Sequence, residues 1–214
     1  TRHIHRIIIH PDDPNTVYVG AIGSPWGEHE ERGVYKTTDG GKTWKKILFT
    51  NIRSGVAELV MDPTNPNKLI AAMWEHKRDP WFFKSGGPGS GLYVTHDGGE
   101  TWEHIGLRNA GQIGAIIIHP QNHNVVYVAA VGSAFNANPE RGIFKTSDGG
   151  RNWEKVLFIS NQVGFSDVEF LPAPRDANGF FGVQFLREFL GHPLAVLFVG
   201  LADDAFAGHV LEGI

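Results

Sequence analysis

An eight-residue pattern that occurs three times constrains this chain more than any other feature. It stands at residues 37–44 (TTDGGKTW), 95–102 (THDGGETW) and 146–153 (TSDGGRNW). Each copy lies between two short apolar runs, and Asp-Gly-Gly between such runs predicts a tight β-hairpin. The glycines permit positive φ, the aspartate can accept hydrogen bonds from the N–H groups that follow it, and the tryptophan can anchor the hairpin to a core. Structural needs therefore account for every residue of the pattern.

The repeat extends beyond the octamer. The pattern of residues 17–44 returns at residues 126–153, 109 positions later and without a gap. A middle copy begins 52 positions after the first, but Asp97 follows Asp39 by 58 positions, so six residues are inserted between its second and third strands. A period near 50 residues with four short strands per unit is the signature of a propeller blade.

We therefore predict an all-β fold, a β-propeller of four-stranded antiparallel blades. Three blades with the octamer occupy about residues 1–50, 51–109 and 110–161, and a fourth begins at residues 162–179. Residues 180–214 form an atypical tail without an octamer, in which a helix over 180–190 is compatible with the short apolar runs. The tail could also be a degenerate blade or a capping element. Because propellers close with four to eight blades, we expect further blades or another chain to complete this one.

Composition narrows the functional classes. The 214 residues suffice for one domain with a core. The net charge of −4 carries no electrostatic footprint for nucleic acid. The absence of cysteine excludes disulfides and thiolate metal sites, and the histidines lack ligand spacing, so we expect no metal and no cofactor. The longest apolar stretch, Leu194–Ala202, is too short to span a bilayer. The chain starts at Thr1 without a signal-peptide pattern, as a fragment or a processed product would.

One face of the propeller should carry the unusual residues. In a four-stranded blade, the loops between strands one and two and between strands three and four lie on the face with the octamers, and the other loops lie on the opposite face. Large loops on a rigid scaffold are common ligand sites. The candidate ligand-binding residues on this face are Trp26, Glu28, His29, Arg78, Asp79 and Trp81. The alternative, which we favour for the two tryptophans, is that they cover the top of the core.

A second candidate site lies in the central channel, which strand one of each blade should line. Arg6, Glu58, Ala115 and Asp167 occupy equivalent positions there. Glu58 and Asp167 could serve as acid and base in glycoside hydrolysis. We favour the alternative of a water-filled channel lined by solvated charges, with Arg6 compensating Glu58.

An identical Glu-Arg pair occurs in two blades, at residues 31–32 and 140–141. We interpret these pairs as blade-to-blade braces rather than as functional groups, because structural ion pairs are common.

The octamer resembles the Asp-box, or BNR repeat, with Asn152 where threonine is usual. Across residues 1–170 the chain resembles the bacterial sortilin-like, BNR-repeat propellers, which are often labelled glycosyl hydrolases. The resemblance implies an exported protein, periplasmic or secreted. It also implies a structural role for the box residues Asp39, Trp44, Asp97, Trp102, Asp148 and Trp153.

Three functional hypotheses follow. The first is a non-catalytic binding module that engages a protein, peptide or glycan through the face with the large loops. The alternative is an exported glycoside hydrolase of the BNR or xyloglucanase type, with Glu58 and Asp167 at the channel mouth. The third is a structural segment of a larger propeller without a site of its own.

Overall fold

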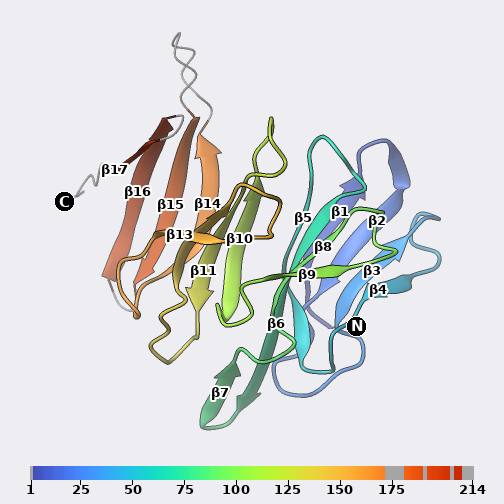
Figure 1. The fold of residues 1–214 in the computed structure, drawn as a ribbon. Helices are drawn as coiled ribbons and strands as arrows, with labels where there is room; N and C mark the ends of the chain where they lie inside the picture. Colours follow the sequence, from blue (N-terminus) through green and yellow to red (C-terminus); the bar gives the residue numbers. More distant parts are fainter. Residues whose placement is uncertain (1, 172–180, 190–191, 203–204, 209–214) are drawn as a thin grey trace.

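The computed structural model describes residues 2–171, 181–189, 192–202 and 205–208 (Figure 1). Within these ranges all regular elements are β-strands, which form four antiparallel sheets that follow one another across the view. The prediction of an all-β fold with four-stranded antiparallel blades is confirmed. No helix of the described residues is long and apolar enough to cross a membrane.

Each sheet is one blade, and its strands pair in chain order. Blade 1 comprises β1 (Ile4–His10), β2 (Asp13–Ala21), β3 (Gly33–Thr37) and β4 (Lys45–Leu48). Blade 2 comprises β5 (Ser54–Met61), β6 (Leu69–Asp79), β8 (Gly91–Thr95) and β9 (Glu103–Gly106), with β7 (Phe82–Ser85) paired to β6. Blade 3 comprises β10 (Gln112–Ile118), β11 (Val126–Gly132), β12 (Gly142–Thr146) and β13 (Glu154–Leu157). The fourth sheet comprises β14 (Gly164–Leu171), β15 (Phe181–Phe189), β16 (His192–Ala202) and β17 (Ala205–Gly208).

The sequence allowed a helix over residues 180–190. This prediction is wrong for residues 181–189, the part of that segment that the structure describes. Residues 181–189 form strand β15, which pairs with β14 on one side and with β16 on the other. Phe181, Val183 and Phe185 alternate along this segment, which is a period of two rather than of 3.6, and Arg187 interrupts the alternation before Phe189. Pairing with two neighbours satisfies the backbone hydrogen bonds that a helix would otherwise satisfy locally.

The core consists of layers between successive blades. In β6, Leu69, Ala71 and Met73 belong to a cluster with residues of blade 1, whereas Ile70 and Ala72 belong to a cluster with residues of blade 3. Successive side chains of a strand point to opposite faces of its sheet, so a blade between two others is apolar on both faces. This explains why β6 begins as an uninterrupted apolar run.

The blades approach each other closely at glycines. A Cβ atom added to Gly55 would lie 1.9 Å from the carbonyl oxygen of Ile22, and one added to Gly164 would lie 2.2 Å from that of Val131. Both contacts join the first strand of one blade to the end of the second strand of the preceding blade. The two glycines are 109 positions apart, so the same close approach recurs with the repeat.

Candidate functional site

The Asp-box turns form closed hydrogen-bond systems. The carboxylate of Asp39 accepts from the Thr37 hydroxyl at 2.7 Å, and from the Thr43 N–H and hydroxyl at 2.9 and 2.6 Å. These donors hold the pKa of Asp39 at about 2. The same contacts recur at Asp97 and at Asp148, whose carboxyl pKa values are also lowered by donors of their turns. In the third turn the Asn152 side-chain amide donates at 2.7 Å in place of a threonine hydroxyl.

These turns define one face of the molecule. The N–H of the first box glycine donates to an asparagine carbonyl oxygen near the start of the second strand of the blade, in the pairs Gly40–Asn15, Gly98–Asn67 and Gly149–Asn124. On the opposite face, the second-to-third-strand loops bond to the loops that enter the next blade, in the pairs His29–Ile52 and Asn138–Asn161. The arrangement of the two faces agrees with the sequence prediction. We call the second one the loop face.

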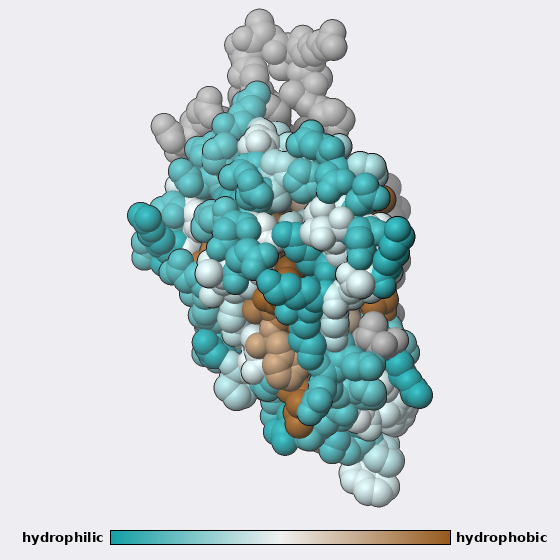
Figure 2. All heavy atoms as spheres, turned by 90° about the vertical axis from the view of Figure 1, so that its right-hand side faces the viewer, coloured by the Kyte–Doolittle hydropathy of each residue, from teal (hydrophilic) through white to brown (hydrophobic). Residues whose placement is uncertain are grey.

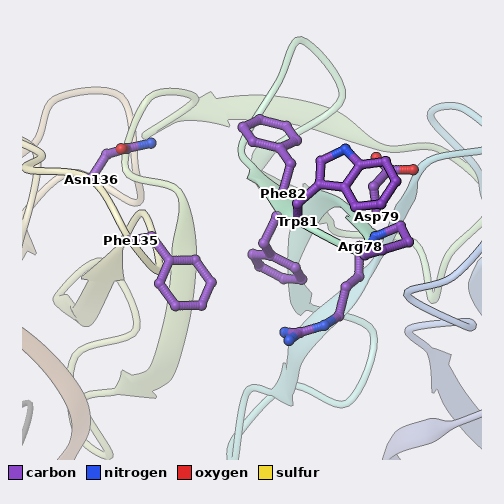
Figure 3. A pocket seen from close by; sticks show the side chains of 8 residues that line it. Arg78, Asp79, Trp81, Phe82, Phe135 and Asn136 are labelled. Atoms are coloured by element: carbon purple, nitrogen blue, oxygen red, sulfur yellow. The ribbon is translucent and has the colours of Figure 1, made fainter.

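A cavity of about 330 Å³ opens on the loop face between blades 2 and 3. The β6–β7 hairpin forms one wall, and the loop after β11 forms the other, with Phe135 and Asn136 facing the hairpin (Figure 3). The lining combines aromatic side chains with planar polar ones, namely Trp81, Phe82, Phe83 and Phe135 with Arg78, Asp79 and Asn136. Phe83 and Phe135 meet edge to face at 5.9 Å between ring centroids, which joins the two walls.

The hairpin stands on a buried polar and aromatic base. The indole of Trp74 stacks on the imidazole of His76 at 4.4 Å, and Phe83 lies against both rings. The buried Glu75 carboxylate accepts from Lys84 Nζ at 2.7 Å and from the Gly89 N–H at 3.3 Å, so it ties β7 and the following loop to β6. The β6–β7 wall of the cavity is therefore fixed by buried contacts of Trp74, Glu75 and His76.

Comparison with known families identifies the repeat. The model of the BNR/Asp-box repeat matches residues 35–46 and 93–104. The chain is a BNR-repeat β-propeller. Its third box, at residues 146–153, has the same turn geometry as the two matched copies.

The BNR-repeat chain is also similar to longer proteins. A xyloglucanase of Hypocrea jecorina (strain QM6a) is 26% identical over 59% of the chain and 14% of its own length. A xyloglucanase of Paenibacillus sp is 22% identical over 81% of the chain and 17% of its own length. The chain therefore spans less than a fifth of these relatives.

Solved structures agree on the fold. An ancestral GH74 enzyme superposes with a TM-score of 0.66 at 16% identity, over 98% of the chain and 25% of its own length. The GH74 enzyme of Niastella koreensis superposes with a TM-score of 0.60 at 18% identity, over 91% of the chain and 29% of its own length. Likeness at these identities bears on the fold alone.

The predicted ligand-binding residues of this propeller divide into two groups. Arg78, Asp79 and Trp81 line the cavity, and the guanidinium of Arg78 lies over the Trp26 ring at 5.7 Å. Trp26 is 63% exposed and Trp81 is 91% exposed, so the interpretation that they cover the core is wrong.

The other predicted residues make structural contacts. Glu28 pairs with Arg53 at 2.7 Å, and the backbone N–H of His29 bonds to Ile52. The sequence reasoning missed Phe135 and Asn136, although Phe135 stands 109 positions after Trp26 and thus repeats its place in the blade.

Of the two predicted channel carboxylates, Glu58 is fully engaged in structural contacts, whereas Asp167 is half-buried. Glu58 is 1% exposed, and both of its oxygens accept hydrogen bonds from the guanidinium of Arg6. Its Oε1 also accepts from the N–H of Leu59 at 2.8 Å, just as Asp167 Oδ1 accepts from the N–H of Val168. Hydrogen bonding to Glu58 raises the pKa of Arg6, with a smaller contribution from the charge of Asp167. Arg6 compensates Glu58 as predicted, but Glu58 is buried rather than solvated.

The arginines of the two Glu-Arg pairs hold the loop face together. Arg32 is fully buried and donates to the carbonyl oxygens of Ser24, Gly27 and Arg53, the last of which belongs to the segment that enters blade 2. Arg141 bonds in the same way to the loop of its own blade that carries Phe135 and Asn136. Arg32 therefore braces blade 1 to the segment that enters blade 2, as predicted. The hydrogen bonds that Arg141 makes among the described residues stay within blade 3, so its interpretation as a blade-to-blade brace is wrong.

Proposed function

We propose that this chain is a non-catalytic binding module of a β-propeller that engages a glycan chain in the cavity on its loop face. The observation that carries the proposal is the exposure of Trp81 beside Phe82, Phe83 and Phe135. Contiguous exposed aromatic residues on a folded protein mark interaction sites, because water contact with them is unfavourable. The side chain of Trp81 is 91% exposed, so it contributes little to the packing of the described residues.

The lining chemistry suits a sugar. Aromatic faces stack on the C–H faces of pyranose rings, and the side chains of Asp79, Asn136 and Arg78 can bond pairs of neighbouring hydroxyl groups. The sequence relatives named as xyloglucanases further support a β-glucan chain as the ligand class. The resemblance to bacterial sortilin-like propellers supports export, which detection of the native protein in the periplasm or medium would test.

Calorimetric titration with xyloglucan and cello-oligosaccharides tests the proposal. We expect Trp81→Ala and Phe135→Ala each to weaken binding at least tenfold, which corresponds to about 1.4 kcal/mol. Trp44→Ala is the matched control, since Trp44 is an exposed tryptophan away from the cavity, and it should bind like the parent. Wild-type affinity in Trp81→Ala would remove the cavity from consideration. Binding of peptides but not of glycans, lost in the same variants, would reassign the ligand class.

A glycoside hydrolase is the second candidate, favoured only by the names of the relatives. A general acid needs a carboxyl group that reaches the glycosidic oxygen, whereas both oxygens of Glu58 are occupied by Arg6. We therefore expect no turnover of xyloglucan by the folded chain. Turnover that disappears in both Glu58→Gln and Asp167→Asn would establish the hydrolase instead.

A further inference from the structure

A second cavity, of about 520 Å³, lies on the Asp-box face between blades 2 and 3. Residues of β9 line one side of it, and the third Asp-box turn lines the other. Val94, Ile105 and Trp153 share the lining with charged side chains. This mixture differs from the apolar stripe that runs over the side of the molecule where blade 1 lies (Figure 2). We call this second space the box cavity.

The repeat explains why the box cavity exists. In blades 1 and 3 a tyrosine on the second strand stands beside a lysine on the third, in the pairs Tyr18–Lys36 and Tyr127–Lys145. The lysine Nζ lies over the tyrosine ring in both blades, at 5.4 and 5.7 Å. Blade 2 has Ile70 and Val94 at these two positions. The side chains that blade 2 turns toward blade 3 are therefore shorter there and carry no polar group.

The interface between blades 1 and 2 shows what the missing pair does. Lys36 Nζ donates to the carbonyl oxygen of Gly98, in the Asp-box turn of blade 2, at 2.9 Å. The Tyr18 hydroxyl donates to the same oxygen at 3.1 Å. The equivalent glycine of blade 3 is Gly149, which lines the box cavity, and no side chain among the described residues donates to its carbonyl oxygen. The box cavity thus takes the place of an ammonium group and a phenol.

The rim of the box cavity differs from its counterpart in the same way. At the first interface Lys45 and Glu100 close the rim with an ion pair at 2.8 Å. The equivalent residues of the second interface, Glu103 and Arg151, both line the box cavity but form no ion pair within the described part of the chain. The rim is therefore open, and it offers a carboxylate to a cation that enters.

The fixed charges favour a cation inside as well. The buried Lys68 ammonium donates to the carbonyl oxygen of His123 and lies 3.7 Å from the carboxylate of Asp62, which offsets its charge. Burial lowers the pKa of His104, so this lining imidazole is neutral at pH 7. The Asp148 carboxylate is held in its own turn, where hydrogen bonds keep its pKa low, and it adds its negative charge without a direct contact.

We propose that the box cavity is a binding site for a primary alkylammonium group. The ammonium donates to the Gly149 carbonyl oxygen, as Lys36 donates to Gly98, and the alkyl chain lies against Val94, Ile105 and Trp153. Free polyamines and lysine side chains of partner proteins both carry this group. The site is independent of the glycan cavity, because the two cavities share no lining residue.

An NMR titration with n-butylammonium tests the proposal, since this compound has the stem and the ammonium of a lysine side chain. We expect saturable shifts of the Gly150 N–H and of the Trp153 indole N–H. Because n-butyltrimethylammonium keeps the charge but has no N–H donor, it should bind about tenfold more weakly. Butyrate should not bind. The absence of saturable shifts, or equal binding of either analogue, would overturn the proposal.

Substitutions test the position of the site. Val94→Lys restores the lysine of the other blades, so its own ammonium should displace butylammonium and weaken its binding at least tenfold without lowering the Tm. Glu103→Lys changes only the exposed rim, so it tests the site without a change in the core, and it should weaken binding several-fold. Glu154→Lys is the matched control, because Glu154 is the exposed equivalent residue of blade 3 and does not line the box cavity. Parent affinity in Val94→Lys, or equal affinities in Glu103→Lys and Glu154→Lys, would contradict the assignment.

Two larger ligands identify the carrier of the ammonium group. Tighter binding of spermidine than of acetyl-lysine methylamide, which blocks both ends of the amino acid, would identify a free polyamine as the ligand. The reverse order would identify a lysine side chain of a partner protein.

Discussion

The aspartate of each Asp-box directs its whole carboxylate into its own turn. In the third box an asparagine amide replaces the threonine hydroxyl as donor to Asp148, at a similar distance. The position therefore requires a donor at a fixed place rather than one residue type. A carboxylate that is satisfied by its own turn is available neither to a substrate nor to a metal.

The close approach of Gly55 to the backbone of Ile22 predicts that a single added methyl group is destabilising. Gly55→Ala should lower the free energy of unfolding by about 1–3 kcal/mol or more, because its Cβ would collide with the backbone of Ile22. Gly27→Ala is the control, since no atom lies within 4 Å of the Cβ position there. Urea unfolding of both variants measures the difference, and equal stabilities would contradict the close approach.

The buried His76 should make the stability of the fold depend on pH. Burial, reinforced by the guanidinium of Arg32, lowers the pKa of His76 to about 4, whereas an unfolded histidine titrates near 6.5. The unfolded state therefore binds the proton first, so stability is full above pH 6.5 and is lost as the pH falls toward 4. The loss by pH 4.5 should be about 2–3 kcal/mol.

Urea unfolding at pH 7 and pH 4.5 measures this loss. His76→Phe keeps a ring against Trp74 but has no proton to bind, so its stability should vary less with pH. The exposed His96 gives the control His96→Gln, which should vary with pH as the wild type does. An unchanged pH dependence in His76→Phe would contradict the assignment.

At the scale of elements, the β6–β7 hairpin is the feature that distinguishes blade 2 from its neighbours. The six inserted residues lengthen β6 beyond the other second strands and add β7. The hairpin joins the loop of blade 1 through the Arg78 N–H, which donates to the Pro25 carbonyl oxygen at 2.6 Å. Three consecutive blades thus contribute to one surface.

Arg32 should control the order of that surface. Arg32→Lys keeps the charge but cannot reach the carbonyl oxygens of Ser24, Gly27 and Arg53 together, so we expect a loss of about 2–4 kcal/mol. Hydrogen exchange should increase in residues 24–31 and 76–85. Arg141→Lys provides the comparison, with faster exchange in residues 133–138 instead. Unchanged exchange at 76–85 in Arg32→Lys would mean that the hairpin is held without this arginine.

At the scale of the whole molecule, the blades form a row in which an apolar layer recurs between successive blades. The interfaces are not identical, since the indole nitrogen of Trp153 bonds to blade 2 whereas the buried indole nitrogen of Trp102 has no partner among the described residues. A residue's burial therefore depends on whether a neighbouring blade covers it. The fourth sheet continues this row at the backbone level, with β14 in contact with β10 and β11 of blade 3.

Because a preceding blade covers blade 3 but not blade 1 in the described chain, the same isoleucine-to-alanine change should lower stability by different amounts in the two blades. Ile116→Ala should cost about 2–4 kcal/mol, since it opens a cavity between blades 2 and 3. Ile7→Ala, at the equivalent position of blade 1, should cost less than about 1 kcal/mol because the side chain is already exposed. Equal losses in denaturant unfolding would show that coverage by a preceding blade does not decide the cost of the substitution.

The sequence by itself determined the hairpin turns, the period and the blades, because Asp-Gly-Gly turns and alternating strands depend on neighbours along the chain. It also indicated Arg78, Asp79 and Trp81 as a group, since they share one loop. Only the tertiary structure decided which repeats of a residue are buried. Ile7 and Ile116 read alike in sequence, as do Trp44 and Trp153, but a preceding blade covers only the second of each pair. Arg6 of blade 1 binds the carboxylate of Glu58 in blade 2, and Phe83 of blade 2 contacts Phe135 in blade 3. In both contacts the two residues come from neighbouring blades and are 52 positions apart in the sequence. Burial and pairing of this kind depend on surfaces that meet in space, which local sequence patterns do not specify.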